Sequence, residues 1–142
     1  MKKIIIVTHG KLSEEFYNTS KLIVGVQPDV ETYSVELGCN IELLKKNITT
    51  SLNESKLINQ EVIILTDIFF GTPFNIVINL IETFNFIHIT GINLGILLEV
   101  LVKRDEITHE NIMEIIELGR NGIVESKNFL EKLDEIEKGG VL

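Results

Sequence analysis

Two runs of four apolar residues, Ile4–Val7 and Val62–Leu65, constrain the fold of this chain most strongly. Neither run alternates with polar residues, so a strand formed by either one would be buried on both faces. Strands of this kind are typical of parallel sheets that carry helices on each side. The two runs therefore predict the central strands of such a sheet.

Strand-like and helical patterns alternate along the rest of the chain. A half-exposed strand is expected around residues 33–37, where apolar and polar residues alternate, and a fourth strand at Phe86–Ile89. Helices are expected at 12–24 with Ser13 as cap, at 41–52, from Pro73 with Thr72 as cap, at Leu94–Lys103, and at Asn111–Leu133 opened by Thr108. This alternation predicts an α/β fold.

The fold class that follows is a doubly wound, mainly parallel sheet with helices on both faces. The half-exposed second strand belongs at an edge and the two most apolar strands at the centre, which favours the strand order 2-1-3-4. We find no repeat, low-complexity segment or linker, so residues 1–142 are expected to form one domain. Chemistry is expected beyond the carboxyl ends of strands 1 and 3, where the winding changes direction.

Composition excludes some classes of partner. The chain has 13 basic and 21 acidic residues, a net charge of −8, and no Lys or Arg between Leu57 and Val102. Such a protein is a poor general binder of nucleic acid or anionic membranes. No apolar run is long enough for a signal peptide or a membrane span, and the single cysteine, Cys39, suits a reducing compartment. We therefore expect a cytoplasmic protein.

A histidine and an aspartate follow the two central strands. His9 comes after the first and Asp67 after the third, and neighbouring strands lie about 5 Å apart. A carboxylate on one imidazole nitrogen fixes the tautomer and leaves the other nitrogen as a nucleophile. Gly10, directly after the histidine, lets another chain approach closely.

The segment "TDIFFGTPFN", Thr66–Asn75, completes the candidate site. We expect Gly71 to permit an unusual backbone turn, and Thr72 and Pro73 to begin a helix whose free N–H groups bind an anion. A nucleophilic nitrogen, an orienting carboxylate and an anion-binding helix start together predict a site that holds a phosphoryl group on histidine. The candidate phosphate-binding residues are Gly10, Gly71, Thr72, Phe74 and Asn75, and the candidate rim residues are Thr8, Thr66 and Asn93.

Each of these features also has a purely structural interpretation. A histidine at a strand end can be a hydrogen-bonding residue, and an aspartate can cap a turn; their coincidence at one switch point favours the functional interpretation. His88 and His109 are interpreted as structural. No His/Cys cluster has metal-ligand spacing and no phosphate-binding nucleotide loop is present, so we expect no metal and no cofactor.

Three motifs resemble a known family. "IIIVTHG", "LTDIFFGTPFN" and "GINLGILLEVLVKRD" are similar to the mannose-type enzyme IIA of the bacterial phosphoenolpyruvate-dependent sugar phosphotransferase system, in the right order and over nearly the whole chain. The resemblance implies that His9 accepts a phosphoryl group from the phosphocarrier protein HPr and passes it to enzyme IIB. It implies that Asp67 orients His9.

The resemblance also implies a setting for the chain. It implies a homodimer in which a sheet edge is completed by an exchanged strand, and indirect association with the IIC and IID membrane components. The resemblance therefore implies that the protein is cytoplasmic. Whether partner subunits attach it to the inner face of the membrane is left undecided. The family often has "GGSPFN" where this chain has Phe70, Gly71 and Thr72, and Asn-x-Pro-Met where it has Asn93, Leu94, Gly95 and Ile96.

Two other functions fit part of the pattern. A receiver domain has a similar fold, but it needs an acidic pair after its first strand to hold Mg²⁺, and Thr8, His9 and Gly10 stand there. A IIA-like subunit could instead serve a cytoplasmic kinase of the dihydroxyacetone type. The "FGTPFN" stretch favours the sugar-uptake branch, in which mannose, fructose, sorbose and amino sugars all remain open as substrates.

Overall fold

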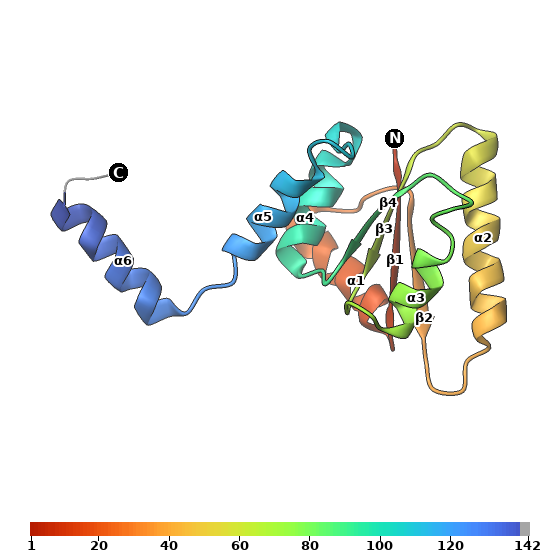
Figure 1. Ribbon diagram of the computed structural model, residues 1–142, viewed down its shortest axis with the longest axis horizontal. Helices are drawn as coiled ribbons and strands as arrows, with labels where there is room; N and C mark the ends of the chain where they lie inside the picture. Colours follow the sequence, from red (N-terminus) through yellow and green to blue (C-terminus); the bar gives the residue numbers. More distant parts are fainter. Residues whose placement is uncertain (140–142) are drawn as a thin grey trace.

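The computed structural model describes residues 1–139, and the last three residues of the expected domain lie outside the described part. The elements are β1 (Lys3–His9), α1 (Leu12–Val24), β2 (Val30–Val35), α2 (Ile41–Leu57), β3 (Val62–Thr66), α3 (Thr72–Ile78), β4 (Ile87–Thr90), α4 (Leu94–Lys103), η1 (Arg104–Glu106), α5 (Ile112–Asn121) and α6 (Ser126–Gly139). The expected alternation of strands and helices is confirmed (Figure 1).

The four strands form one parallel sheet in the order β2-β1-β3-β4, as the sequence predicts. Ile5 of β1 stands beside Glu31 of β2 and beside Ile64 of β3. The central run Ile4–Val7 is fully buried, whereas every residue of the edge strand β2 is half-buried. The carboxyl ends of β1 and β3 therefore meet at one edge of the sheet.

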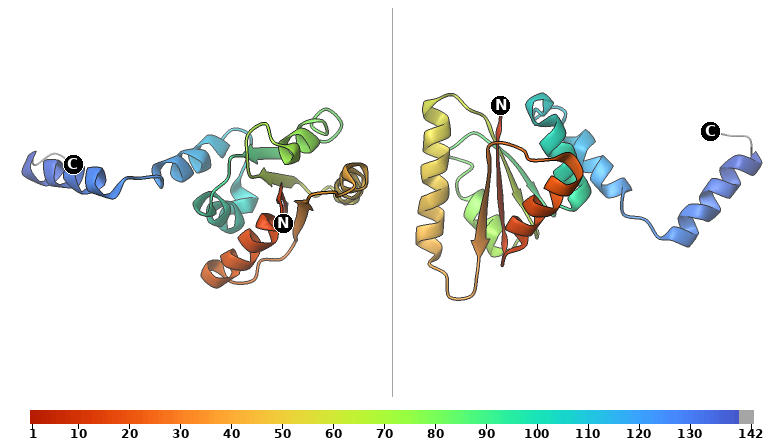
Figure 2. Two further views of the ribbon diagram at one scale, coloured as in Figure 1. Left: turned by 90° about the horizontal axis from the view of Figure 1, so that it is seen from below. Right: turned by 180° about the vertical axis from the view of Figure 1, so that it is seen from behind.

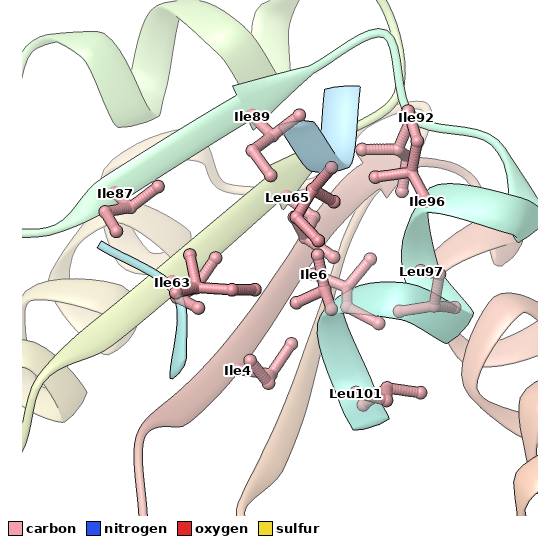
Figure 3. Close-up of a cluster of buried hydrophobic side chains, with 13 residues drawn as sticks. Ile4, Ile6, Ile63, Leu65, Ile87, Ile89, Ile92, Ile96, Leu97 and Leu101 are labelled. Carbon is pink, nitrogen blue, oxygen red and sulfur yellow. The ribbon is translucent and has the colours of Figure 1, made fainter. Parts of the chain in front are cut away.

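Alternate side chains of the central strands fill two separate cores. Ile4 and Ile6 pack with Leu65, α4 and α5 on one face, where α1 also lies (Figure 3). Ile5 and Val7 pack on the other face with α2 and α3. Burial on both faces explains why these strands lack polar residues. Over residues 1–139, no helix combines the length and apolarity that crossing a bilayer requires.

The expected single helix Asn111–Leu133 is wrong, because the structure divides it into α5 and α6. Gly122 ends α5, and its N–H donates to the Leu118 carbonyl oxygen (3.2 Å). The Glu125 carboxylate then accepts from the N–H groups of Lys127 (3.3 Å) and Asn128 (2.8 Å), which opens a new helix. α6 has no buried residue and projects away from the sheet in all views (Figures 1 and 2).

The expected cap of α1 is wrong. α1 begins at Leu12, and the Ser13 N–H donates to the Thr8 hydroxyl at 2.7 Å, so the capping oxygen comes from β1. Thr108 opens the turn that leads into α5, as expected: its hydroxyl accepts the Asn111 N–H (3.3 Å), and Asn111 Oδ1 accepts the Thr108 N–H (2.8 Å). The helix itself begins at Ile112, whose N–H donates to the Thr108 carbonyl oxygen at 3.1 Å.

A partly buried ion pair joins the opposite end of β1 to β2. Lys3 Nζ lies 2.9 Å from Glu31 Oε1 and 3.1 Å from Ser51 Oγ, and only 8% of the Lys3 side chain is exposed. Ser51 and Tyr33 donate hydrogen bonds to Glu31 Oε2 at 2.6 and 2.8 Å. Burial acts to raise the pKa of Glu31, but the hydrogen bonds from Ser51, Lys3 and Tyr33 outweigh it and hold that pKa below 4.5.

We expect Lys3→Met to lower the free energy of unfolding by about 2 kcal/mol near neutral pH, since hydrogen bonds to charged groups contribute about 1.5–3 kcal/mol. The lowered pKa of Glu31 means that its stabilisation is complete above the ordinary value of 4.5 and is lost as the pH falls through the folded-state pKa. Urea unfolding of both proteins across the acidic range measures this. The difference between them should shrink with acid, and a constant difference would contradict the assignment.

Candidate functional site

The carboxyl ends of β1 and β3 bring His9 and Asp67 into contact. His9 is the last residue of β1, and Asp67 directly follows β3. Asp67 Oδ2 lies 3.0 Å from His9 Nδ1 and also accepts the His9 backbone N–H at 3.0 Å. Asp67 Oδ1 accepts the Ile68 N–H at 3.0 Å. One carboxylate therefore fixes both the main chain and the ring of His9.

This contact determines which nitrogen of His9 can react. An ionised carboxylate can only accept hydrogen bonds, so its partner Nδ1 carries the proton and Nε2 keeps its lone pair. The His9 side chain is 45% exposed, whereas that of Asp67 is 7% exposed. The site thus presents an oriented imidazole on the surface above a buried carboxylate.

Gly71 lies directly against the His9 ring. A Cβ at this position would stand 2.8 Å from His9 Cε1 and 3.5 Å from Nε2, so glycine is required for space. The expectation that Gly71 permits an unusual turn is wrong, since its φ is −83°. The left-handed residue is its neighbour Phe70, at φ +62°, a conformation that residues with a side chain rarely adopt.

The first turn of α3 differs from expectation at its cap. Thr72 is the first residue of the helix and its side chain is exposed; Gly71 occupies the cap position and no side chain caps the helix. The first bond of the helix runs from Asn75 N–H to the Gly71 carbonyl at 2.9 Å. The N–H groups of Thr72 and Phe74 precede that bond, and Pro73 has none. These N–H groups lie at the end of α3 that begins beside His9.

Two of the expected rim residues are buried, and the third, Asn93, is half-buried. Thr8 and Thr66 are fully buried, and the Thr66 hydroxyl lies 2.9 Å from His88 Nε2. Asn93 accepts the Ile96 N–H (2.9 Å) at the start of α4 and donates to a carbonyl of α5 at 3.1 Å. Gly10 takes a positive φ of 55°, which lets the chain turn directly after His9.

Sequence reasoning missed an aromatic cluster beside the site. The rings of Phe69 and Phe70 lie 3.9 Å apart, and the Phe74 ring is 5.3 Å from each. Phe74 in turn lies 5.5 Å from the ring of His88, whose pKa is lowered to about 4 by burial, so this histidine is uncharged at neutral pH. Two phenylalanines directly after "TDI" were the available signal.

Known proteins resemble this chain in sequence and in fold. The sequence model of the family described as "PTS system fructose IIA component" matches residues 3–117. The fructose-specific EIIA component of Bacillus subtilis strain 168 is 30% identical over 114 residues, which is 80% of this chain and 77% of that protein.

Solved structures agree with this relation. The PTS IIA protein associated with the fucose utilization operon of Streptococcus pneumoniae superposes with a TM-score of 0.80 at 26% identity, covering 91% of this chain and 96% of that one. EIIA from Streptococcus agalactiae gives a TM-score of 0.80 at 27% identity, covering 90% and 99%. The chain therefore belongs to the fructose/mannose family of IIA components of the sugar phosphotransferase system, and has a phosphotransferase role in that system.

Proposed function

We propose that His9 accepts a phosphoryl group from phospho-HPr and passes it to enzyme IIB for phosphorylation-coupled sugar uptake. The observation that carries this proposal is the 3.0 Å contact between His9 Nδ1 and Asp67 Oδ2, which leaves Nε2 as the reactive nitrogen on an exposed ring. A carrier needs a nucleophile that partner proteins can reach, and this ring meets that need.

The proposed reaction is a direct transfer between two histidines. The lone pair of His9 Nε2 attacks phosphorus, the N–P bond of the donor breaks, and its electron pair returns to the donor ring. The proton on Nδ1 stays on His9, hydrogen-bonded to Asp67, while the ring gains positive charge that the carboxylate stabilises. Transfer to enzyme IIB repeats the same exchange from the Nε2–P bond.

The phosphoryl oxygens are proposed to lie over Gly71 and the first turn of α3. The N–H groups of Thr72 and Phe74 stand ahead of the first helical bond, and Gly10 and Asn75 complete the proposed segment. Backbone N–H groups hold a phosphate without a strong cationic clamp. This suits a group that must be given away as readily as it is taken.

The proposed setting is a single IIA domain spanning residues 1–142 that works at the cytoplasmic side of the membrane. Its partners are HPr, enzyme IIB and, indirectly, the IIC and IID membrane components. A phosphotransfer subunit for a dihydroxyacetone-type kinase is the second candidate, because it would use the same histidine. The genes beside this one separate the two: IIB, IIC and IID against kinase subunits.

The direct test is labelling of the wild-type protein. Incubation with Enzyme I, HPr and labelled phosphoenolpyruvate should give an acid-labile, base-stable phosphoramidate that maps to the peptide containing His9. A label with the stability of an acyl phosphate would mark an aspartate instead and favour a receiver-like domain. No label at all would overturn the proposal.

A homodimer is the proposed assembly. Within residues 1–139, β4 pairs only with β3, so its other edge is open there, and an isolated domain must cover or pair such an edge. Ile123 lines the groove beside this edge together with His88 and Thr90. Ile123 and Val124 are 76% and 57% exposed β-branched residues, which suit the exchanged strand that the family resemblance implies.

We expect light scattering at micromolar concentration to report about twice the 16.1 kDa chain mass. Val124→Pro should shift this mass toward one chain, because proline cannot donate to a ladder of backbone hydrogen bonds. Circular dichroism serves as the folding control. A wild-type protein that stays monomeric at this concentration would contradict the proposed dimer.

A further inference from the structure

Three consecutive apolar side chains lie exposed beside His9. Ile68, Phe69 and Phe70 are 57%, 58% and 70% exposed, and they fill the interval between Asp67 and Gly71. Both flanking residues contact His9. A contiguous exposed apolar patch next to a reactive group is typical of an interaction site.

The rings of this patch are fixed before any partner arrives. Phe69 and Phe70 lie 3.9 Å apart, and both make edge contacts at 5.3 Å with Phe74, which is only 9% exposed. Phe74 is itself backed by the ring of His88 at 5.5 Å. Rings held from below lose little conformational freedom when a partner covers them, which favours tight binding.

Phe70 combines a strained backbone with an exposed ring. Its φ of +62° lies in the region that glycine adopts without strain and other residues rarely adopt. The side chain is 70% exposed, so it contributes little to the buried core. A strained backbone together with an exposed aromatic ring fits a role in binding a partner.

Direct transfer dictates what covers this patch. The donor phosphorus must come within about 3–3.5 Å of the attacking nitrogen. The edge of the His9 ring that carries Cε1 and Nε2 lies beside Gly71, so a donor protein that reaches Nε2 also comes close to Phe70, the preceding residue. We infer that Ile68, Phe69 and Phe70 form the docking platform for the protein that delivers the phosphoryl group to His9. This inference rests on the proposed function.

The test measures how the rate of transfer depends on the concentration of phospho-HPr. Phe70→Gly removes the ring and relieves the backbone strain, so the fold should be retained. We expect the half-saturating phospho-HPr concentration to rise about tenfold or more, the loss typical of a buried aromatic anchor, while the limiting rate changes less than about twofold. Phe69→Ala, which leaves the backbone of Phe70 unchanged, should act in the same direction.

The matched control is Leu22→Ala, an 87% exposed apolar side chain near the far end of α1. It should leave both quantities unchanged. The docking role would be contradicted if Phe70→Gly and Phe69→Ala left the half-saturating phospho-HPr concentration unchanged. It would also be contradicted if these variants lowered only the limiting rate. Neither result would contradict the proposed function. Absence of transfer to the wild-type protein would overturn both, and would be seen before any variant is measured.

Discussion

His9→Ala should reduce phosphorylation by Enzyme I, HPr and phosphoenolpyruvate to the background of the assay. The substitution removes Nε2, the ring nitrogen whose lone pair the contact between Nδ1 and Asp67 leaves free, on a side chain that is 45% exposed. The loss should be complete, because within residues 1–139 no second nucleophilic side chain is hydrogen-bonded to Asp67. Acid-labile label per chain, measured after quenching in base, reports the effect.

The two remaining histidines provide the internal control for this variant. His88 is half-buried and packed against Phe74, and its Nε2 lies 2.9 Å from the Thr66 hydroxyl, so this nitrogen is engaged within the fold. His109 lies in the exposed turn before α5. Persistent labelling at either histidine in folded His9→Ala protein would show that the nucleophile has been assigned to the wrong residue.

Asp67→Asn should slow transfer from phospho-HPr by about 10²–10⁴-fold, the range usual for such assistance. The amide keeps the size of the carboxylate, but its NH₂ group can donate to Nδ1. This stabilises the tautomer of His9 that carries the proton on Nε2, the nitrogen that has to attack. The positive charge that develops on the ring also loses its counter-charge. In a serine protease the corresponding change costs about 10⁴-fold, and here the histidine is itself the nucleophile, so a smaller loss is expected.

Quenched-flow measurement of transfer at saturating phospho-HPr isolates this effect from docking. The fold should be retained, since Asp67 lies beyond the end of β3 and outside both cores, and circular dichroism checks this. Leu22→Ala is again the matched surface control. Near-normal transfer in folded Asp67→Asn protein would show that Asp67 has only a structural role, accepting the Ile68 N–H in the turn.

The architecture could be predicted because the central strands leave little choice. Ile4–Val7 and Val62–Leu65 are apolar on both faces, and the structure buries them in the middle of the sheet with β2 at its edge. The break between α5 and α6 could not be predicted from periodicity, since apolar residues keep helical spacing on both sides of it. The break depends on Gly122 and on the Glu125 cap, which are single residues within that pattern.

The candidate site was predicted unevenly. The contact of His9 with Asp67 follows from strand order alone, because strands 1 and 3 are neighbours and both residues follow their ends. The separate roles of Phe70 and Gly71 in the next turn cannot be predicted from strand order. A glycine in a turn usually indicates a positive φ. Here Gly71 is needed because a larger side chain would collide with the His9 ring, and Phe70 takes the left-handed conformation. Only the packed side chains distinguish these two reasons for a glycine.

Nearly half of the His9 side chain faces water, and this has an energetic consequence for the proposed carrier. Under the proposed function, a phosphoryl group on such a ring stays in contact with water on its open side, so we expect its transfer potential to stay close to that of phosphohistidine in solution. Transfer of the phosphoryl group to His9 and away from it then involves only a small change in free energy. Under the proposed function, the direction of flow depends on the ratio of loaded donor to empty acceptor, and the fraction of loaded His9 follows the cell's supply of phosphoenolpyruvate.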